Sequence, residues 1–293
     1  MPAASDNPPI LPPTCCSATA RPCNTPGAGD STDRLFTING TAAAQNATID
    51  ASGSGAINFT NAGNLAYGTT GQTRTLILTG TSTDSNTLAA TVANNGAGAT
   101  SLTKNGAGAW VLSGANAYTG ATAVNAGTLE AGVASVAGVS GAFGNNSAVT
   151  LANVVGATLD ITGYDTQIGS LAGGGTAGGG VNLGAATLTV GGDGTNTTYA
   201  GVITSSGSPA VSLVKTGGGA LTLSAANTLS GGVTVNGGTL ELTNADALGI
   251  GAGKPTVTLG TGATLKTSIG ANVDFGNDIV LAGNATVLGT TKN

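Results

Sequence analysis

The chain has 293 residues, a net charge of −5 and a mean hydropathy of +0.24. Its eight basic residues leave no positive stripe for a nucleic-acid backbone, so we expect no nucleic-acid partner. Low charge with moderate hydrophobicity is the opposite of a disordered composition, and aromatic residues at 3% exclude a wide core of large rings. Small apolar and hydroxyl side chains, together with 51 glycines, must therefore pack into something thin and regular.

Residues 1–33 are rich in Pro, Ser, Asp and Gly, and we predict a flexible, unstructured lead. All the cysteines, Cys15, Cys16 and Cys23, lie in this lead. An odd number crowded into one segment is no disulfide framework, so we interpret them as a tolerated exposed cluster, with intermolecular pairing or metal capture as alternatives. The opening MPAASDNPPILPPTCC has no basic start followed by an apolar segment, so we do not expect a secretion signal there.

From about Arg34 onward, short segments alternate apolar with hydroxyl side chains. In chain order they include AINF (56–59), TLILT (75–79), AWVLS (109–113), TLTV (187–190), ALTLS (220–224) and TVTL (256–259). A period of two is typical of a strand with one buried face, and the intervening Gly, Asn, Asp and Ser are typical of turns. No window keeps an apolar period of 3.6, and no apolar run reaches the roughly 18 residues of a membrane helix. We expect almost no helix.

One glycine-rich segment occurs twice in the chain. SLTKNGAGAWVLSGANAYTGATAVNAGTLEAG (101–132) matches SLVKTGGGALTLSAANTLSGGVTVNGGTLELT (212–243) without a gap, and a third copy begins after Thr267. Repeated units of strands and turns are typical of solenoids, because each unit buries its apolar face only against its neighbours. Three short strands in a coil of about 20–25 residues predict an all-β fold, a right-handed parallel β-helix over 34–293. Roughly five coils would fill one period, and about ten would form a rod about 50 Å long.

The residues kept between the copies suggest roles within a coil. We predict that the glycines and the pair Asn116 and Asn227 form positive-φ corners, which exclude a Cβ. Large side chains that differ are predicted to fill the bore, since many apolar shapes can do so: Trp110 opposite Leu221, and Tyr118 opposite Leu229.

Two charged positions are also kept between the copies, Lys104 with Lys215 and Glu130 with Glu241. We predict that these four side chains lie on the solvent side at the edges of the coils, where charges discourage pairing with another strand edge. A ligand contact is the alternative.

Catalytic chemistry has few candidates here. The absence of histidine removes a Ser–His or Cys–His nucleophile and any imidazole metal site. A carbohydrate-active β-helix needs paired carboxylates, or carboxylate-bound calcium with an arginine base. The nearest carboxylate pairs cross turns and are interpreted as turn caps: Asp160 with Asp165, and Asp274 with Asp278. Arg34 and Arg74 neighbour no acidic cluster. We predict no catalytic, cofactor-binding or metal-binding residue, and a chain that is not an enzyme.

Three weaker patterns are interpreted structurally. GGDGTNTTY (191–199) is similar to a calcium-binding nonapeptide but occurs once, so we predict a glycine-rich corner. GGGTAGGG (173–180) lacks the Lys-Ser/Thr and the helix of a phosphate-binding loop, so we predict a flexible loop. The pairs Thr73/Thr75 and Thr187/Thr189 do not recur at a coil period, which argues against a threonine array that binds ice.

The two copies resemble a known family. LTKNGAGAWVLSGANAYTGATAVNAGTLEAG and LVKTGGGALTLSAANTLSGGVTVNGGTLELT, with a Lys, a glycine cluster and a closing GTL, are similar to the passenger-associated transport repeat. This repeat, also called the autotransporter-associated β-strand repeat, occurs in secreted passengers of Gram-negative autotransporters.

The resemblance implies a secreted or cell-surface β-helical passenger, associated with the outer membrane and exported through an outer-membrane translocator barrel outside this chain. The repeat would help passage and folding outside the cell. Our leading interpretation is a structural stalk that displays the passenger and assists its secretion. The alternatives are an adhesin that binds host glycan, matrix or sister passengers, and a carbohydrate-active enzyme.

Overall fold

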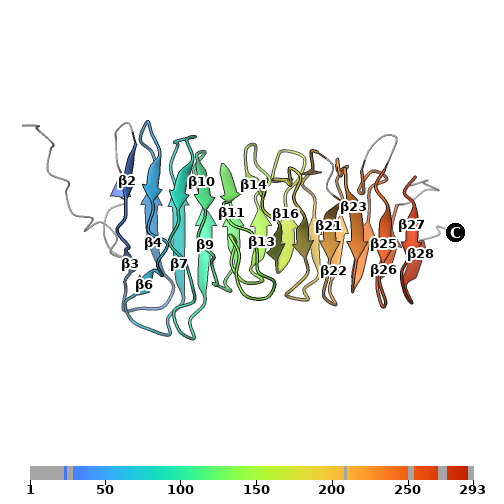
Figure 1. The fold of residues 1–293 in the computed structure, drawn as a ribbon, viewed down its shortest axis with the longest axis horizontal. Helices are drawn as coiled ribbons and strands as arrows, with labels where there is room; N and C mark the ends of the chain where they lie inside the picture. The colour runs from blue at the N-terminus through green and yellow to red at the C-terminus, as the bar shows by residue number, and fades with distance from the viewer. Residues whose placement is uncertain (1–22, 25–28, 208–209, 250–253, 270–275, 290–293) are drawn as a thin grey trace, which may run out of the picture.

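The computed structural model describes residues 23–24, 29–207, 210–249, 254–269 and 276–289, which form strands and turns. No helix in this part of the chain has the length and apolar character to cross a membrane. The strands lie side by side along one axis, so the molecule is a rod that runs from its N-terminal to its C-terminal end (Figure 1). Every paired strand is parallel to its neighbours. The predicted parallel β-solenoid is confirmed; its right-handedness stays a prediction that rests on the strong preference of parallel crossovers.

Three sheets form the faces of the rod. Face A has 12 strands, β1 (Cys23–Asn24), β4 (Gln45–Asp50), β7 (Arg74–Thr79), β9 (Thr100–Lys104), β11 (Thr122–Val124), β13 (Ala148–Leu151), β16 (Ser170–Gly173), β19 (Thr197–Tyr199), β22 (Ala220–Leu223), β24 (Thr239–Leu242), β26 (Thr264–Thr267) and β28 (Thr286–Gly289). Face B has 8 strands, β2 (Asp30–Thr32), β5 (Ile57–Phe59), β8 (Asn86–Leu88), β10 (Ala109–Leu112), β12 (Thr128–Ala131), β14 (Thr158–Asp160), β17 (Gly180–Asn182) and β20 (Ile203–Thr204).

Face C has 6 strands, β15 (Thr166–Ile168), β18 (Leu188–Val190), β21 (Val211–Lys215), β23 (Gly232–Val235), β25 (Val257–Leu259) and β27 (Ile279–Leu281). The short strands β3 (Thr37–Ile38) and β6 (Ala66–Tyr67) pair only with each other. Consecutive strands of face A mark consecutive coils. At about 4.8 Å per step, twelve of them make a stack about 50 Å long, as expected.

The core is one column of aliphatic side chains along the axis of the rod. Successive residues of a strand point to opposite sides of the sheet, so β7 and β24 alternate buried and half-buried positions. Leu221 pairs with Leu240, which pairs with Leu265, and all three side chains are buried. Trp110 and Tyr118 are buried as well, opposite the buried Leu221 and Leu229 in the second copy. Side chains of different shape therefore do fill the same bore.

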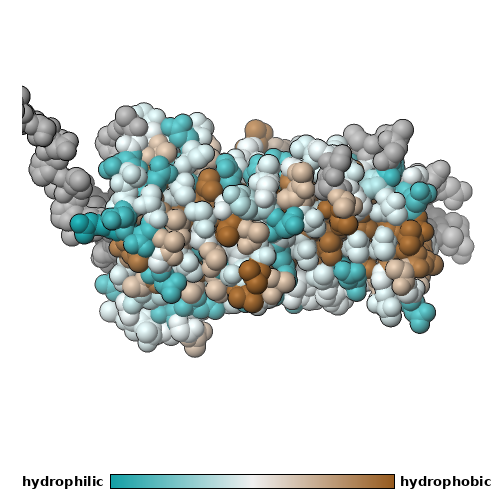
Figure 2. Space-filling model, in the orientation of Figure 1, coloured by the Kyte–Doolittle hydropathy of each residue, from teal (hydrophilic) through white to brown (hydrophobic). Residues whose placement is uncertain are grey.

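The two ends of the described stack have features that its middle lacks. β1 and β2 lie inside the predicted lead and pair in parallel with β4 and β5. The start of the solenoid at Arg34 stays a prediction. The rest of the lead, with Cys15 and Cys16, lies outside the described residues. At the other end, the inward positions Ile279 and Leu281 are 43% and 59% exposed, whereas the core residues before them are covered. Figure 2 shows apolar surface gathered at this end.

Candidate functional site

The two copies of the repeated segment occupy different faces of the rod. β9, β10, β11 and β12 lie on faces A, B, A and B, while their counterparts in the second copy, β21, β22, β23 and β24, lie on faces C, A, C and A. Along the chain, β19 lies on face A four coils after β9. The next two strands, β20 and β21, lie on faces B and C, which adds two-thirds of a coil. One period is therefore four and two-thirds coils, close to the five expected, and the second copy is rotated by one face.

Lys104 lies inside the rod, at a corner of the first copy. It ends β9, where alternation with the buried Thr100 and Leu102 turns its side chain inward. Its Nζ donates hydrogen bonds to the carbonyl oxygens of Asn105 at 2.9 Å, Gly106 at 2.8 Å and Ala126 at 2.9 Å. Burial lowers the pKa of Lys104 to about 8. The three carbonyl dipoles favour the charged form, so the lysine acts as a cation at neutral pH.

Lys215 makes the same contacts in the second copy. Its Nζ donates to the carbonyls of Thr216, Gly217 and Gly237, which are the counterparts of the three acceptors in the first copy. Burial lowers the pKa of Lys215, and the nearby charge of Asp193 acts in the opposite direction. The prediction that these lysines lie on the solvent side is wrong, because both side chains are buried and bind backbone carbonyls.

Glycines make these lysine corners possible. Gly106 and Gly217 have φ values of +70° and +65°, a region that other residues rarely adopt. A Cβ on Gly106 would lie 2.4 Å from the carbonyl oxygen of Gly80, and one on Gly217 would lie 2.0 Å from that of Gly191. The corners of successive coils therefore touch through their backbones, and the predicted role of the glycines is confirmed here.

Asn116 and Asn227 have a different role from the predicted one. Neither is among the residues with positive φ, and both are fully buried. Asn116 Oδ1 accepts from the Val92 amide of the preceding coil, and its Nδ2 donates to the Ala142 carbonyl of the following coil, at 2.8 and 2.7 Å. The positive-φ interpretation is therefore wrong for the asparagines: their side chains bridge three coils.

The same bridge occurs at two other places. Asn227 accepts from the Ile203 amide and donates to the Ala247 carbonyl. Asn86 on β8 accepts from the Ile57 amide and donates to the Ala109 carbonyl. Each asparagine satisfies backbone groups where strand pairing is interrupted.

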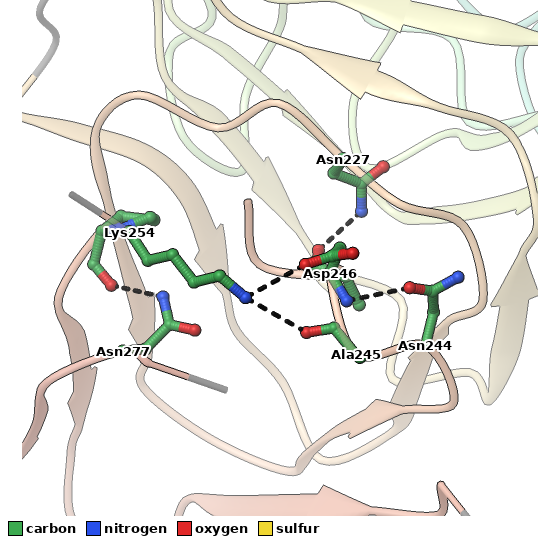
Figure 3. A network of polar contacts seen from close by, with 8 residues as sticks. Asn227, Asn244, Ala245, Asp246, Lys254 and Asn277 are labelled. Atoms are coloured by element: carbon green, nitrogen blue, oxygen red, sulfur yellow. Dashed lines mark hydrogen bonds and ion pairs between the residues drawn. The ribbon is translucent and has the colours of Figure 1, made fainter. Parts of the chain in front are cut away.

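Figure 3 shows the surroundings of Asn227. The side-chain amide of Asn227 donates to the Ala247 carbonyl at 2.7 Å, and the Asp246 backbone amide donates to Asn244 Oδ1 at 2.8 Å. The backbone amide of Asn227 donates to the Asp246 carbonyl at 3.0 Å. The Asp246 carboxylate forms an ion pair with Lys254 at 3.1 Å. In this turn a carboxylate and a lysine neutralise each other, which contrasts with the buried lysines of the repeats.

The two kept glutamates lie half-buried on the outer side of the sheets. Glu130 pairs in register with Asp160, and burial together with the Asp160 charge raises the pKa of Glu130. Glu241 pairs in register with Lys266, whose Nζ lies 2.8 Å from Glu241 Oε1. Hydrogen bonds from Lys266 and Ser268 lower the pKa of Glu241. Glu130 therefore faces a repulsive neighbour, and Glu241 an attractive one.

Of the acidic residues weighed as catalytic candidates, Asp160 caps a turn and Asp165 binds the next coil. Asp160 accepts from the Thr162 amide at 2.8 Å and from Asn182 Nδ2 at 2.7 Å, and Asp165 accepts from the Thr187 amide at 2.8 Å. Asp274 lies outside the described residues, so its pair with Asp278 is not seen. Within the described part of the chain, no three His, Cys, Asp or Glu side chains gather as metal ligands would.

The arginines differ from one another. Arg34 is exposed, whereas Arg74 is buried, with Nη1 bound to the carbonyls of Ala42 and Thr73 and Nη2 bound to those of Gly40 and Thr69. A guanidinium held by carbonyls in this way is not placed to act as a base.

The glycine-rich motifs also form turns. In GGDGTNTTY, Asp193 accepts from the amide and hydroxyl of Thr195, and Gly191 and Gly194 have positive φ. In GGGTAGGG, Gly175 and Gly178 pair across a short loop. Thr75 has Asn46 and Ser101 as register neighbours, so no continuous threonine column forms there.

Comparison with known proteins agrees with the repeats. A family model described as the passenger-associated transport repeat matches residues 102–131 and 213–242. The Adhesin BmaC autotransporter of Brucella suis biovar 1 (strain 1330) is 47% identical over 133 residues, which cover 45% of this chain and 4% of that protein. No solved structure matches. The chain thus spans a small part of the relative's length.

These matches confirm the resemblance to autotransporter passengers that carry transport repeats. They also support a secreted or cell-surface location, associated with the outer membrane of a Gram-negative bacterium.

Proposed function

We propose that this chain is a structural segment of an autotransporter passenger, a stalk that displays the passenger at the cell surface and assists its own secretion and folding. The observation that carries the proposal is the uninterrupted 12-stranded parallel stack of face A, into which both transport repeats are built. A rod of this kind holds whatever adjoins it at a fixed distance. Its partner in export would be an outer-membrane translocator barrel.

The stack supplies a physical reason for assistance in secretion. Each new coil covers the aliphatic side chains of the coil before it, as Leu240 covers Leu221 and is covered by Leu265. Burial of apolar surface stabilises by about 25 cal/mol per Å², so coil formation outside the pore opposes backward movement of the chain. Stacking in a solenoid needs only a neighbouring coil, so folding can follow emergence coil by coil.

Surface display tests this proposal. The chain would be placed between a secretion signal and an autotransporter barrel, and protease accessibility on intact cells would be measured. We expect efficient exposure for the natural sequence and retention for a variant with Leu221, Leu240 and Leu265 changed to Ser, because its coils cannot bury one another. A matched variant with the outward Thr222 and Thr239 changed to Ser should behave like the natural chain. Equal exposure of all three proteins would contradict the proposal.

A second function is favoured by the relative, which is named an adhesin. Face A offers a surface for it, because its outward residues from β7 to β22 carry no charge and, apart from one isoleucine, are small or hydroxyl-bearing: Thr75, Ile77, Ser101, Thr103, Ala123, Thr150, Ala172, Thr198 and Thr222. Purified rod would be tested for binding to host cells, matrix proteins, glycans and itself. Saturable binding that is lost when Thr103 and Thr150 are changed to Lys would establish the adhesin. If the rod binds none of these, the adhesin is excluded and the stalk remains the proposed function.

We propose that the chain is not an enzyme. In support, Asp160 accepts a hydrogen bond within a turn, Asp165 accepts one from the next coil, and Arg74 is buried among carbonyls. Incubation of the purified rod with a panel of acidic and neutral polysaccharides should release no new reducing ends or unsaturated products. Release of either would revive a carbohydrate-active function.

A further inference from the structure

The described residues include three buried cations, and none of them pairs with a carboxylate. Arg74, Lys104 and Lys215 bind backbone carbonyls instead, and each joins two successive coils. Arg74 binds Gly40 and Ala42 in one coil and Thr69 and Thr73 in the next. A buried charge is costly unless it is fully hydrogen-bonded, so such an arrangement depends on both coils being in place.

The lysines make this dependence specific to the transport repeats. Lys104 takes two acceptors from its own corner and one, Ala126, from the following coil. Lys215 does the same with Gly237 as the acceptor in the following coil. Among the described residues, no backbone amide donates to the carbonyls that these lysines bind. The ammonium and the carbonyls of two coils therefore satisfy one another.

The stems of both lysines occupy inner positions of the aliphatic column. Lys104 lies in register between Leu78 and Val124 on face A. Lys215 lies between Val190 and Val235 on face C. A slip by one residue would turn such a side chain to the other side of the sheet and remove the ammonium from its acceptors. If one coil were missing or out of register, a buried aliphatic side chain would lose only packing, whereas the buried ammonium would also lose its carbonyl acceptors, which costs far more.

We infer that each transport repeat folds as one cooperative unit of two coils, in which the buried lysine joins the corner of its own coil to the corner of the next and sets their register. This goes beyond the proposed function, because it holds for a stalk and for an adhesin alike. It also explains why a lysine stands in the core of each repeat although the two copies lie on different faces.

Native-state amide hydrogen exchange on the full chain tests the inference, with Lys104→Met as the main variant. Met keeps the stem and removes the donors. We expect the amides of β9, β10, β11 and β12 to exchange at least about tenfold faster, and by a common factor, because hydrogen bonds to a charged group are lost between both coils. The amides of β21–β24 should keep their natural rates. Leu102→Met, a buried change in the same strand without loss of donors, is the matched control and should change these rates much less.

Lys215→Met should give the reciprocal pattern, with faster exchange in β21–β24 only. The inference is overturned if either Met variant leaves the rates unchanged, or if exchange accelerates in the lysine's own coil while the following coil keeps its protection. If Lys104→Met cannot be purified, Lys104→Gln is used, which keeps two N–H donors on a neutral group. Its amides in β9–β12 should again exchange faster by one shared factor, and this factor should be smaller than for Lys104→Met. Purified protein is used throughout, so failure of export in the display experiment would not affect this result.

Discussion

At the scale of single residues, the polar side chains inside the rod hold successive coils together. Asn116 and Asn227 each join the coils on both sides, and Lys104 and Lys215 each join a coil to the next. A parallel stack interrupted by turns leaves backbone groups without a strand partner, and buried backbone groups need one. Asparagine and lysine side chains supply it where the turns interrupt the ladder.

Asn116→Ala should lower the free energy of unfolding by about 2–4 kcal/mol, because it leaves the Val92 amide and the Ala142 carbonyl buried without partners. Asn227→Ala should have a similar effect through Ile203 and Ala247. Denaturant titration measures both. Asn125→Ala removes an exposed amide and should cost little. A loss for Asn116→Ala no larger than for this control would contradict the bridging role.

The buried lysines predict a dependence of stability on alkaline pH. Burial lowers the folded-state pKa of Lys104 to about 8, whereas an unfolded lysine titrates near 10.5. Between these values the unfolded chain binds the additional proton, so the free energy of unfolding should rise with pH. Below about pH 8 both states hold the proton and this slope vanishes. The neutral amine still donates two N–H groups, so the corner persists.

Denaturant titrations between pH 8 and about 9.5 would measure this rise, and the double variant Lys104→Met, Lys215→Met should lack it. Higher pH is avoided because burial raises the pKa of Tyr118 and Tyr199, and ionisation of tyrosine in the unfolded chain opposes the trend there. Equal pH dependence in the natural protein and the double variant would exclude the lysines as its source.

At the scale of strands, neighbouring outward residues determine whether a pair of strands attracts or repels. Glu130 on β12 lies beside Asp160 on β14, whereas Glu241 on β24 lies beside Lys266 on β26. The surrounding strands are equivalent in the two copies. The molecule therefore contains a like-charge pair and an opposite-charge pair in the same setting.

Double-mutant cycles should give couplings of opposite sign for these pairs. We expect an unfavourable coupling of about 0.5 kcal/mol between Glu130 and Asp160, and a favourable one of similar size between Glu241 and Lys266, since partly exposed pairs contribute little. The cycles would use Glu130→Gln with Asp160→Asn, and Glu241→Gln with Lys266→Met, near pH 7. Both couplings should shrink in high salt. Couplings of the same sign would contradict the electrostatic interpretation.

At the scale of the whole molecule, the repeat period and the coil period do not coincide. Because the period from Lys104 to Lys215 makes four and two-thirds coils, the same segment lies on faces A and B in one copy and on faces C and A in the other. No face is therefore reserved for the repeat. What the repeat preserves is the sequence of contacts between one coil and the next.

Excision of residues 105–215 should therefore give a shorter rod that still folds. Thr216 would then follow Lys104 directly. Lys104 could therefore bind the carbonyls of Gly217 and Gly237, which Lys215 binds in the natural chain, in place of its own acceptors. The C-terminal part would rotate by one face, and the longest dimension measured by small-angle X-ray scattering should fall by about 22 Å. Excision of residues 105–210 breaks the phase of the repeat and should give a poorly folded chain. Cooperative unfolding of the second product, or unfolding of the first, would contradict this account.

Local pattern was sufficient to predict much of this architecture. Alternating segments such as TLILT and ALTLS gave the strands, because a side chain's side of a sheet follows from its neighbours in sequence. The doubled segment predicted stacked coils, because no single copy can bury its own apolar face. The same alternation placed Lys104 inward, in step with Thr100 and Leu102, but the general rule that lysine is exposed outweighed it.

Only the tertiary structure decided how the polar side chains are used and which face each copy occupies. The Ala126 acceptor of Lys104 and the partners of Asn116 belong to neighbouring coils, 22 to 26 positions away in sequence, and no local pattern brings them together. Face identity depends on the summed lengths of all the turns between the copies, so it too is decided only when the coils stack. Alternation within a strand is a property of the chain, whereas satisfaction of a buried charge is a property of the assembled coils.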